Sequence, residues 1–321
     1  MNRIETALAK NKNASFILEL FSPKYLLTWA GILILKLSTF LPYDLLMKIG
    51  NIMGNVIYKV SPTRAEIVKI NLEKCLAVKG EELENLVKLN FQSLGRGIFE
   101  MAYAWWASDK KIRNLPQIII NEDLLKNSST GALVLIKHST HLELDLRILS
   151  CYFDLTGMYK LQTNKVINHM MIRSREKYIK GSVVNNEVLK AVRWVKEGKR
   201  FLYAADQDYG EKVSTMIPFF KTPAARVKFP AMLSKKNVNV VMADVSKIEK
   251  NYVVELISLN NLQDDEDFLK QMNILYEECI KKEPEGYLWM HRRFKSGIKN
   301  SIYPKLVRRE RKRSKKRAKR N

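Results

Sequence analysis

Residues Gly131–Leu149 read GALVLIKHSTHLELDLRIL, and this stretch decides the fold that the sequence predicts. Ala132–Ile136 is a short apolar run rich in β-branched and leucine side chains, which predicts a fully buried strand. After His138 the apolar residues recur with helical spacing, so a helix should follow directly. His138 therefore lies at a strand-to-helix turn, where α/β proteins tend to place their chemistry.

Glu143 follows His138 by five residues, in the first turn of the predicted helix. A carboxylate there can hydrogen-bond one imidazole nitrogen, which leaves the other free to take a proton from a hydroxyl. Two other interpretations stay open. Thr140 and Glu143 fit a capping box, in which Glu143 only caps the helix. His138 and His141 are spaced like metal ligands, but no cysteine or further histidine cluster accompanies them, so we expect no metal.

Composition bounds the class of protein. The chain has 321 residues with 46% apolar content, which is enough for one large domain or two small ones with a real core. Three widely spaced cysteines argue against a disulfide framework and for a reducing compartment. The net charge of +23 implies an anionic partner, either nucleic acid, a phospholipid surface or an acidic protein.

A membrane-anchoring segment is predicted near the start of the chain. Tyr25–Leu41 carries one charge, Lys36, in seventeen residues. As a helix it would extend about 25 Å, the short limit for crossing a bilayer. Tyr25 and Trp29 suit one membrane interface and Leu41 ends the apolar run. An amphipathic or buried core helix is the alternative, so the sequence leaves open whether the segment spans the membrane.

Along the rest of the chain, predicted helices alternate with predicted strands, which indicates an α/β fold. An apolar segment at 217–220 suits a loop that lines a groove. Helices are predicted over 42–60, 63–76, 81–106, 168–178, 189–196 and 264–282, and strands at 118–120, 132–136, 157–159, 200–205, 239–244 and 252–256.

A second polar cluster stands beyond the strand predicted at 200–205. Asp206 and Asp208 follow that strand as His138 follows its own. Strand ends that converge in one sheet can build one site, so we expect the two clusters to meet.

Several blocks of this sequence resemble a known family. HSTHLE is similar to the His-x4-Asp/Glu motif of the glycerolipid acyltransferases. The flanking blocks resemble, in order, the lipid A late acyltransferases, with the lauroyl-transferring members nearest in pattern. The likeness covers roughly residues 15–300 and rests on blocks at 22–32, 71–73, 142–144, 206–210 (DQDYG) and 287–295 (YLWMHRRFK).

The resemblance implies a central mixed sheet flanked by helices, within an acyltransferase domain at 45–304. Residues 1–44 would anchor it to the cytoplasmic face of the bacterial inner membrane. The implied reaction moves an acyl chain of about twelve to fourteen carbons from acyl carrier protein to a hydroxyl on a hydroxyacyl chain. The acceptor would be an anionic, Kdo-bearing lipid A precursor of lipopolysaccharide biosynthesis. His138 would be the general base, oriented by Glu143.

Supporting roles also come from the resemblance. Asp206 is expected to pair with Arg175, and His291 to be structural. Residues 224–229 (AARVKF) depart from the small, uncharged residues that the family tends to have there. The residues implied to bind substrate or support the site are Arg173, Arg175, Asp206, Asp208, Arg292 and Arg293.

The chain lacks several motifs that are typical of other catalytic mechanisms. The chain has no Gly-x-Ser-x-Gly elbow, Walker loop or dinucleotide fingerprint, so we expect neither a serine acyl-enzyme nor a nucleotide cofactor. A glycerophospholipid acyltransferase is an alternative, although its usual Pro-Glu-Gly-Thr-Arg-like block is missing. A cytosolic thioesterase is a further alternative, but such an enzyme would not need the apolar anchor predicted near the start of the chain.

The tail at 305–321 is a separate region. Eleven of residues 305–320 are Lys or Arg against one Glu, which predicts a disordered basic segment outside the resemblance. It could reinforce docking to an anionic membrane. Contact with nucleic acid is the alternative, but the core lacks a basic-aromatic binding pattern, so we do not expect a nucleic-acid partner.

Overall fold

The structure is a computed structural model that describes residues 17–126, 130–259, 262, 264–296 and 302–303. The basic tail predicted at 305–321 lies outside the described residues. The helices are η1 (Pro23–Tyr25), α2 (Leu26–Ser38), α3 (Tyr43–Val60), α4 (Pro62–Leu76), α5 (Gly80–Trp106), α6 (Asp109–Arg113), α7 (Asp123–Lys126), α8 (Leu142–Leu149), α9 (Lys165–Arg175), α10 (Val188–Lys196), η2 (Glu211–Val213), α11 (Phe229–Ser234), α12 (Asp265–Lys282) and η3 (Pro284–Gly286). The strands are β1 (Gln117–Ile120), β2 (Ala132–Ile136), β3 (Leu155–Tyr159), β4 (Ser182–Val184), β5 (Arg200–Ala204), β6 (Ser214–Phe219), β7 (Thr222–Val227), β8 (Asn239–Ile248) and β9 (Asn251–Leu259).

The main sheet is mixed, as predicted. Its strand order is β1-β9-β8-β2-β5-β3-β4. Strand β2 runs parallel to both β5 and β8, and β3 runs parallel to β5 and β4. The tight hairpin from β8 to β9 reverses the direction, and β1 then pairs in parallel with β9.

Strand β2 lies at the centre of this sheet, between β8 and β5. All five of its residues are buried, with exposures between 0% and 6%. A strand covered on both faces has no polar side, which explains why ALVLI is continuously apolar rather than alternating. The prediction of a buried strand that ends just before His138 is confirmed.

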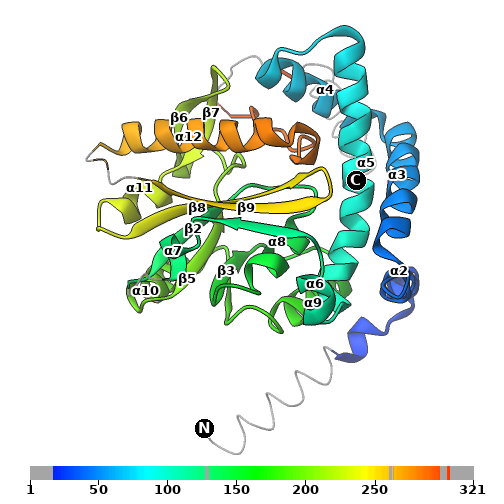
Figure 1. The fold of residues 1–321 in the computed structure, drawn as a ribbon. Coiled ribbons are helices and arrows are strands. Elements are labelled where there is room, and N and C mark those ends of the chain that lie inside the picture. Colours follow the sequence, from blue (N-terminus) through cyan, green and yellow to red (C-terminus); the bar gives the residue numbers. More distant parts are fainter. Residues whose placement is uncertain (1–16, 127–129, 260–261, 263, 297–301, 304–321) are drawn as a thin grey trace, which may run out of the picture.

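Helices flank the sheet on both sides (Figure 1). Helix α12 lies along one face, while α8, α9 and α6 lie toward the other. The long helix α5 stands across these layers at one side of the molecule, with α3 outside it. This layered arrangement confirms the predicted α/β class.

Helices α3 and α5 approach each other at their glycines. A Cβ atom built on Gly95 would lie 2.0 Å from the carbonyl oxygen of Gly50 and 2.5 Å from the amide nitrogen of Gly54. Only residues without a side chain allow two helix backbones so close. The outer helix α3 is thereby held firmly against α5, whose inner face contacts the site described below.

One prediction about this part of the chain is wrong. Residues 217–220 do not form a loop along a groove, because 214–219 is strand β6, paired antiparallel with β7. Ile217 and Phe219 are both fully buried in the core. The alternation of buried and exposed residues along β6 is the period of a strand, which the short apolar run at 217–220 did not reveal.

The predicted anchor segment forms η1 and α2. No helix in the described part of the chain is long and apolar enough to cross a bilayer. Trp29 stacks on Phe21 with 5.5 Å between ring centroids, and its Nε1 donates to the carbonyl of Leu20. None of the residues of α2 is buried. The large apolar side chains exposed on and around α2 and α3 are Leu26, Leu27, Leu33, Ile34, Leu37, Phe40, Leu41, Leu45, Ile52, Val56 and Val60; this set is the apolar face.

Candidate active site

The site is built where β2 and β5 end side by side. Ile136 pairs with Ala204 in the parallel register, so the residues that follow them lie at the same edge of the sheet. There the backbone N–H of His138 donates to Oδ2 of Asp206 at 2.8 Å, and Nδ1 of His138 contacts Oδ1 of the same carboxylate. The expectation that the two polar clusters meet is confirmed.

Asp206 is fully buried, while the His138 side chain keeps 18% of its surface exposed. Burial alone would raise the pKa of the Asp206 carboxyl, but His138, through its ring and its backbone N–H, and Arg226 together hold that pKa well below its usual range. An ionised Asp206 fixes the tautomer with the proton on Nδ1. The Nε2 atom of His138 has no hydrogen-bond partner among the described residues, so it is the ring nitrogen able to accept a proton.

Both pairings expected from the sequence are wrong. Glu143 does not orient His138. Its carboxylate accepts instead from Nε1 of Trp105 at 2.9 Å and from Nε of Arg175 at 3.2 Å, with a second contact to Nη2 of Arg175. Arg175 therefore pairs with Glu143 rather than with Asp206. The sequence could not distinguish two carboxylates near one strand end, because the choice depends on which helix packs over each.

The capping box is not formed either. Helix α8 begins at Leu142, and its N-cap His141 makes no capping hydrogen bond through its side chain. Thr140 points to α5 instead, where its Oγ1 lies 2.7 Å from Oγ of Ser93. Gly97 of α5 makes this approach possible, since a Cβ there would lie 2.0 Å from the carbonyl oxygen of Thr140.

His141 is buried behind the site and is held by two carboxylates. Its Nδ1 lies 2.6 Å from Oδ1 of Asp145, and its Nε2 lies 3.2 Å from Oε2 of Glu283. Burial opposes a charge on this ring, but Asp145 and Glu283 raise the pKa of His141 well above its usual value. We infer a charged imidazolium that locks the turn to the end of α12, a structural use of the second histidine of HSTH.

The segment after α12 supports the site from another side. The N–H of Leu288 donates to the carbonyl of His138 at 2.9 Å, and the N–H of Thr140 donates to Gly286 at 2.7 Å. His291 accepts from the N–H of Asp208 at 3.1 Å through Nε2. Burial, reinforced by His138, lowers the pKa of His291 to about 4 despite the opposing effect of Asp206. His291 is thus a neutral ring held against the backbone of Asp208, and the structural role expected of it stays a prediction.

The remaining predicted site residues are spread apart. Asp208 is buried and caps local backbone, accepting from the N–H and hydroxyl of Ser296 and from the N–H of Gly210. Arg293 is only 2% exposed and donates to the carbonyl of Ala225, so it cannot meet a phosphate at the surface. Arg173 is exposed and Arg292 is half-buried. The structure joins the predicted residues in two pairs, His138 with Asp206 and Glu143 with Arg175, and their roles stay predictions.

Trp105 and Arg226 are partners of the site that sequence reasoning missed. Trp105 is buried, as expected of a tryptophan in a core helix, yet its indole N–H donates to Glu143. In the sequence, Arg226 was noticed only because residues 224–229 depart from the pattern of the resembled family. A single charged residue within an apolar segment was the signal that could have indicated a buried, functional arginine.

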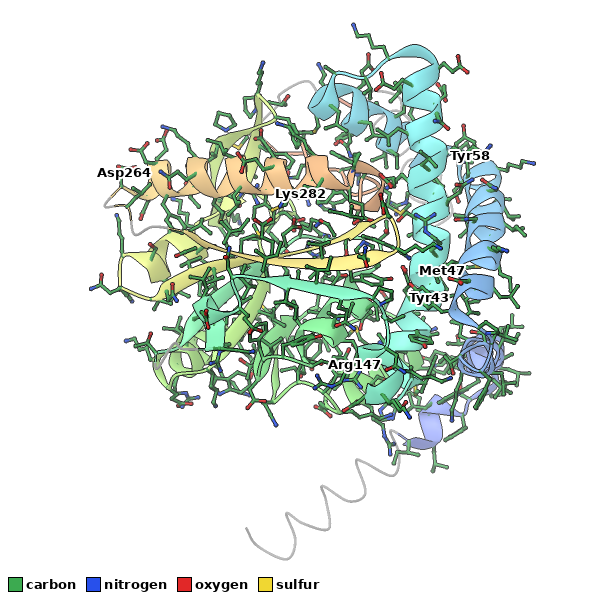
Figure 2. All side chains as sticks on the ribbon, viewed as in Figure 1. Tyr43, Met47, Tyr58, Arg147, Asp264 and Lys282 are labelled. Atoms are coloured by element: carbon green, nitrogen blue, oxygen red, sulfur yellow. The ribbon has the colours of Figure 1, made fainter. Side chains whose placement is uncertain are left out.

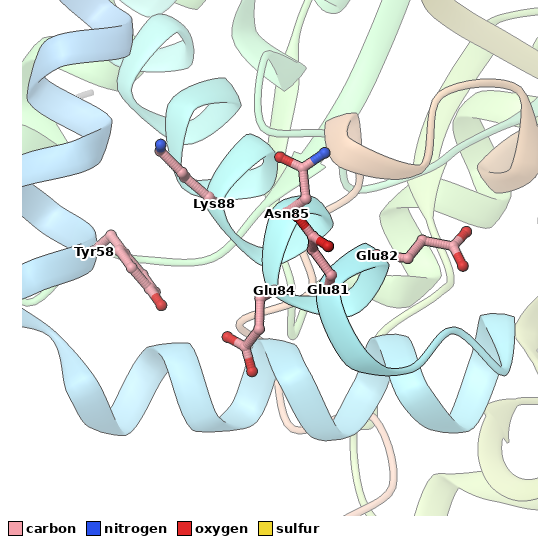
Figure 3. A pocket seen from close by; sticks show the side chains of 6 residues that line it. All are labelled: Tyr58, Glu81, Glu82, Glu84, Asn85 and Lys88. Atoms are coloured by element: carbon pink, nitrogen blue, oxygen red, sulfur yellow. The ribbon is translucent and has the colours of Figure 1, made fainter.

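A surface hollow of about 630 Å³ lies away from this site (Figure 3). It opens near the start of α5, whereas Ser93, Gly97 and Trp105 reach the site from later turns of the same helix. Its acidic lining would repel an anionic ligand, so we do not assign it a role in catalysis. The lining residues are Tyr58, Glu81, Glu82, Glu84, Asn85 and Lys88.

A histidine oriented by a buried carboxylate, at the carboxyl ends of parallel strands, defines a candidate general base for a hydroxyl substrate. A family model described as bacterial lipid A biosynthesis acyltransferase matches residues 14–296. This chain belongs to that family and is an acyltransferase of lipid A biosynthesis.

Curated relatives extend over most of both chains. The lipid A biosynthesis lauroyltransferase of Escherichia coli is 31% identical, over 88% of this chain and 95% of its own. The palmitoleoyltransferase of the same organism is 30% identical over 88% and 95%. A lipid A biosynthesis acyltransferase of Haemophilus influenzae is 29% identical over 86% and 92%. Among solved structures, the 1-acyl-sn-glycerophosphate acyltransferase of Thermotoga maritima aligns with a TM-score of 0.36 and 9% identity, over 71% of this chain and 94% of that one.

Proposed function

We propose that this chain transfers a fatty acyl group of about twelve to fourteen carbons from acyl carrier protein to a hydroxyl on a hydroxyacyl chain of a Kdo-bearing lipid A precursor. The observation that carries the proposal is the His138–Asp206 pair, with Nδ1 bound to the carboxylate and Nε2 unpartnered in the described part of the chain. The names of the relatives support the acceptor class, and two of them transfer chains of different length.

The proposed reaction is direct transfer. Nε2 of His138 removes the proton of the acceptor hydroxyl, and the resulting alkoxide attacks the carbonyl carbon of the donor thioester. The tetrahedral intermediate then breaks its carbon–sulfur bond, and the leaving thiolate takes the proton back from His138. Asp206 stabilises the transient imidazolium, and backbone N–H groups in the first turn of α8 are candidate donors to the oxyanion.

Arg175 is proposed to bind an anionic group of the acceptor. Its Nε and Nη2 are occupied by Glu143, which fixes the guanidinium beside the turn that carries His138. Burial opposes the charge, but Glu143 raises the pKa of Arg175 above its usual value. A cation that stays charged and oriented in a half-buried position suits recognition of a phosphate.

The apolar face is proposed to bind the cytoplasmic surface of the bacterial inner membrane. Leu27 and Ile34 of α2 are 87% and 65% exposed, and Phe40, between α2 and α3, is 77% exposed. Exposed apolar area of this extent marks an interaction surface, and a helix can bury such a face in the headgroup region without spanning. Nearby lysines, among them Lys24, Lys36 and Lys48, suit anionic lipid.

The first experiment offers lauroyl and myristoyl acyl carrier protein together with either a Kdo-bearing lipid A precursor or a lysophospholipid, in detergent. We expect product with the lipid A precursor and loss of transfer in His138→Ala, with the fold checked by circular dichroism. Product with the lysophospholipid alone would overturn the acceptor, and full activity in a folded His138→Ala would overturn the base. Acyl-CoA in place of the carrier tests the donor, because equal rates would remove the carrier protein as a required partner.

A further inference from the structure

Two arginines lie buried directly behind the candidate base. Arg226, in β7, is 0% exposed and Arg293 is 2% exposed. Their guanidinium carbons lie 5.5 and 5.0 Å from the centroid of the Phe219 ring, and that of Arg226 also lies 4.9 Å from the ring of Tyr276. Nη1 of Arg226 donates to the carbonyl of Ala205 at 2.7 Å. The charge of Arg226 is therefore fixed beside the residue that precedes Asp206.

These buried charges are poorly satisfied by hydrogen bonds. The Nε and Nη2 atoms of both arginines have no partner within the described ranges. Burial, reinforced by Arg293, lowers the pKa of Arg226 to about 10, which still leaves it protonated at neutral pH. A buried cation with unsatisfied donors weakens a fold, and apolar replacement of such groups is often neutral or stabilising. The ring contacts and the single hydrogen bond of Arg226 leave two donors unused, so stability alone does not call for an arginine at 226, whereas its position next to the site gives it a use.

Asp206 directly follows Ala205, whose carbonyl binds Arg226, so the buried cation is held near this carboxylate. Arg226 is one of the groups that favour the ionised form of Asp206, together with His138 on the opposite side. The other polar groups around the carboxylate come from several elements. They are Tyr276 of α12, Tyr287 and His291 after η3, and Tyr209 after β5, while Arg293 acts on Arg226 and on each of these rings except that of Tyr276. The three tyrosines are held neutral by burial, and His291 is neutral as well.

We propose that Arg226 is a positioning residue for the His138–Asp206 pair. Held against the carbonyl of Ala205, its buried charge lies beside the pair and opposes the addition of a further proton to it, which leaves Nε2 of His138 to accept the proton of the substrate hydroxyl. This inference rests on the proposed function, because it assigns a purpose to a residue that acts through the base. Arg226 touches neither substrate nor reacting atoms in this account.

The sign of the effect follows from electrostatics. A proton added to the pair increases its positive charge, and a nearby cation opposes that addition. Removing the cation therefore raises the proton affinity of the pair, whichever member holds the proton. Transfer needs the proton-free form of His138, so the acid limb of the pH–rate profile should move to higher pH.

The test compares Arg226→Met, Arg226→Gln and Arg226→Lys in the full chain. The matched control is Arg200→Met, which removes a half-buried arginine at the opposite end of β5, where its Nε donates to Leu125. Three readouts are taken: the pH profile of acyl transfer, the pH dependence of carbethoxylation of His138 by diethyl pyrocarbonate followed by mass spectrometry, and the melting temperature. The second readout needs no substrate.

We expect the midpoint of both pH profiles to rise by about one unit or more in Arg226→Met and Arg226→Gln. Arg226→Lys, which keeps the charge, should stay closer to the wild type, and Arg200→Met should not move the midpoint. Arg226→Met should melt at the same temperature as the wild type or higher. If Arg226→Met does not fold, Arg226→Gln is the variant in which the shift of the midpoint is measured.

An unchanged midpoint in a folded Arg226→Met or Arg226→Gln, or an equal shift in Arg226→Lys, overturns the inference and leaves Arg226 as packing. A shifted carbethoxylation midpoint in a protein that transfers no acyl group would support the electrostatic role of Arg226 while the proposed function fails. Transfer that is lost in His138→Ala, with no midpoint moving in the arginine variants, would overturn this inference alone.

Discussion

Arg175 binds Glu143 through two guanidinium nitrogens, with Nε 3.2 Å from Oε2 and Nη2 against Oε1. The carboxylate that follows His138 by five residues is thus committed to an arginine of α9 and to Trp105 of α5. The carboxylate that orients His138 comes instead from Asp206, 68 residues further along the chain. The two acidic residues therefore have separate tasks, and the structure predicts that their substitutions differ in kind.

Asp206→Asn should lower kcat by about 10² to 10⁴-fold with little change in KM, because an amide no longer fixes the Nδ1–H tautomer or stabilises the imidazolium. Steady-state kinetics with the acceptor varied separate the two constants. Glu143→Gln should act mainly on KM for the acceptor, since it releases Arg175. If Glu143→Gln removes kcat while Asp206→Asn retains it, Glu143 is the orienting residue after all.

The Glu143–Arg175 ion pair should show thermodynamic coupling. Both side chains are largely buried, with 15% and 13% of their surface exposed. A cycle of Glu143→Gln, Arg175→Gln and the double variant should give a coupling free energy of about 0.5 to 3 kcal/mol in urea unfolding. Additive single effects would show that the pair does not act as a unit in solution. The exposed ion pair of Lys180 and Asp154 is the control, and the same double-variant cycle on it should give a coupling free energy close to zero.

Gly97→Ala should damage the site through the backbone. The new Cβ would lie 2.0 Å from the carbonyl oxygen of Thr140, so α5 or the turn that carries His138 has to shift. We expect the free energy of unfolding to fall by about 1–3 kcal/mol, together with a loss of kcat. Gly31→Ala in α2 is the control, because nothing lies within 4 Å of its Cβ and helix propensity alone should add up to about 1 kcal/mol. Equal effects of the two substitutions would contradict the close approach.

Glu100 should make stability depend on acidic pH. Burial would raise the pKa of Glu100, but Lys247, His141 and two tyrosine hydroxyls lower it from 4.5 to about 2. These hydroxyls belong to Tyr252 and to Tyr43, which lies beside Met47 on α3 (Figure 2). Because the folded value lies below the unfolded one, this stabilisation is present above about pH 4.5 and is lost as the pH falls toward 2. It amounts to about 3 kcal/mol at neutral pH.

Urea unfolding at several pH values measures this contribution. The wild type should lose stability between pH 4.5 and 2 more steeply than Glu100→Gln. The substitution of Glu73, an exposed residue, by Gln is a suitable control and should leave the slope unchanged. Parallel curves for wild type and Glu100→Gln would mean that Glu100 is not held ionised by its neighbours.

The apolar face should govern membrane binding. Leu27→Asp combined with Ile34→Asp should weaken flotation with vesicles of phosphatidylglycerol and phosphatidylethanolamine by tenfold or more, since each buried leucine or isoleucine side chain contributes about 1.5–3 kcal/mol. Leu189→Asp on α10 removes an equally exposed side chain, 86% exposed, away from that face and should have no effect. Unchanged flotation of a folded double variant would exclude α2 as the membrane contact.

The sequence by itself determined the local elements and the class of chemistry. The continuous apolar run at 132–136 fixed a central strand, because only burial on both faces tolerates ALVLI. The change of period after His138 fixed the turn, and the order of its motifs placed the chain in its family. Helix periodicity likewise gave α3, α4, α5 and α12 close to their observed bounds.

Tertiary structure alone decided the partners. Whether Glu143 or Asp206 faces His138 depends on the register of β2 with β5 and on α5 and α9 packing over α8, and these are contacts between residues 32 to 68 positions apart. The surroundings of Arg293, Ile217 and Phe219 were decided in the same way, because the β6–β7 hairpin buries all three side chains. Residue type and local spacing encode propensity and burial, but the direction in which a charged side chain points is fixed only when neighbouring elements compete for it in the assembled fold.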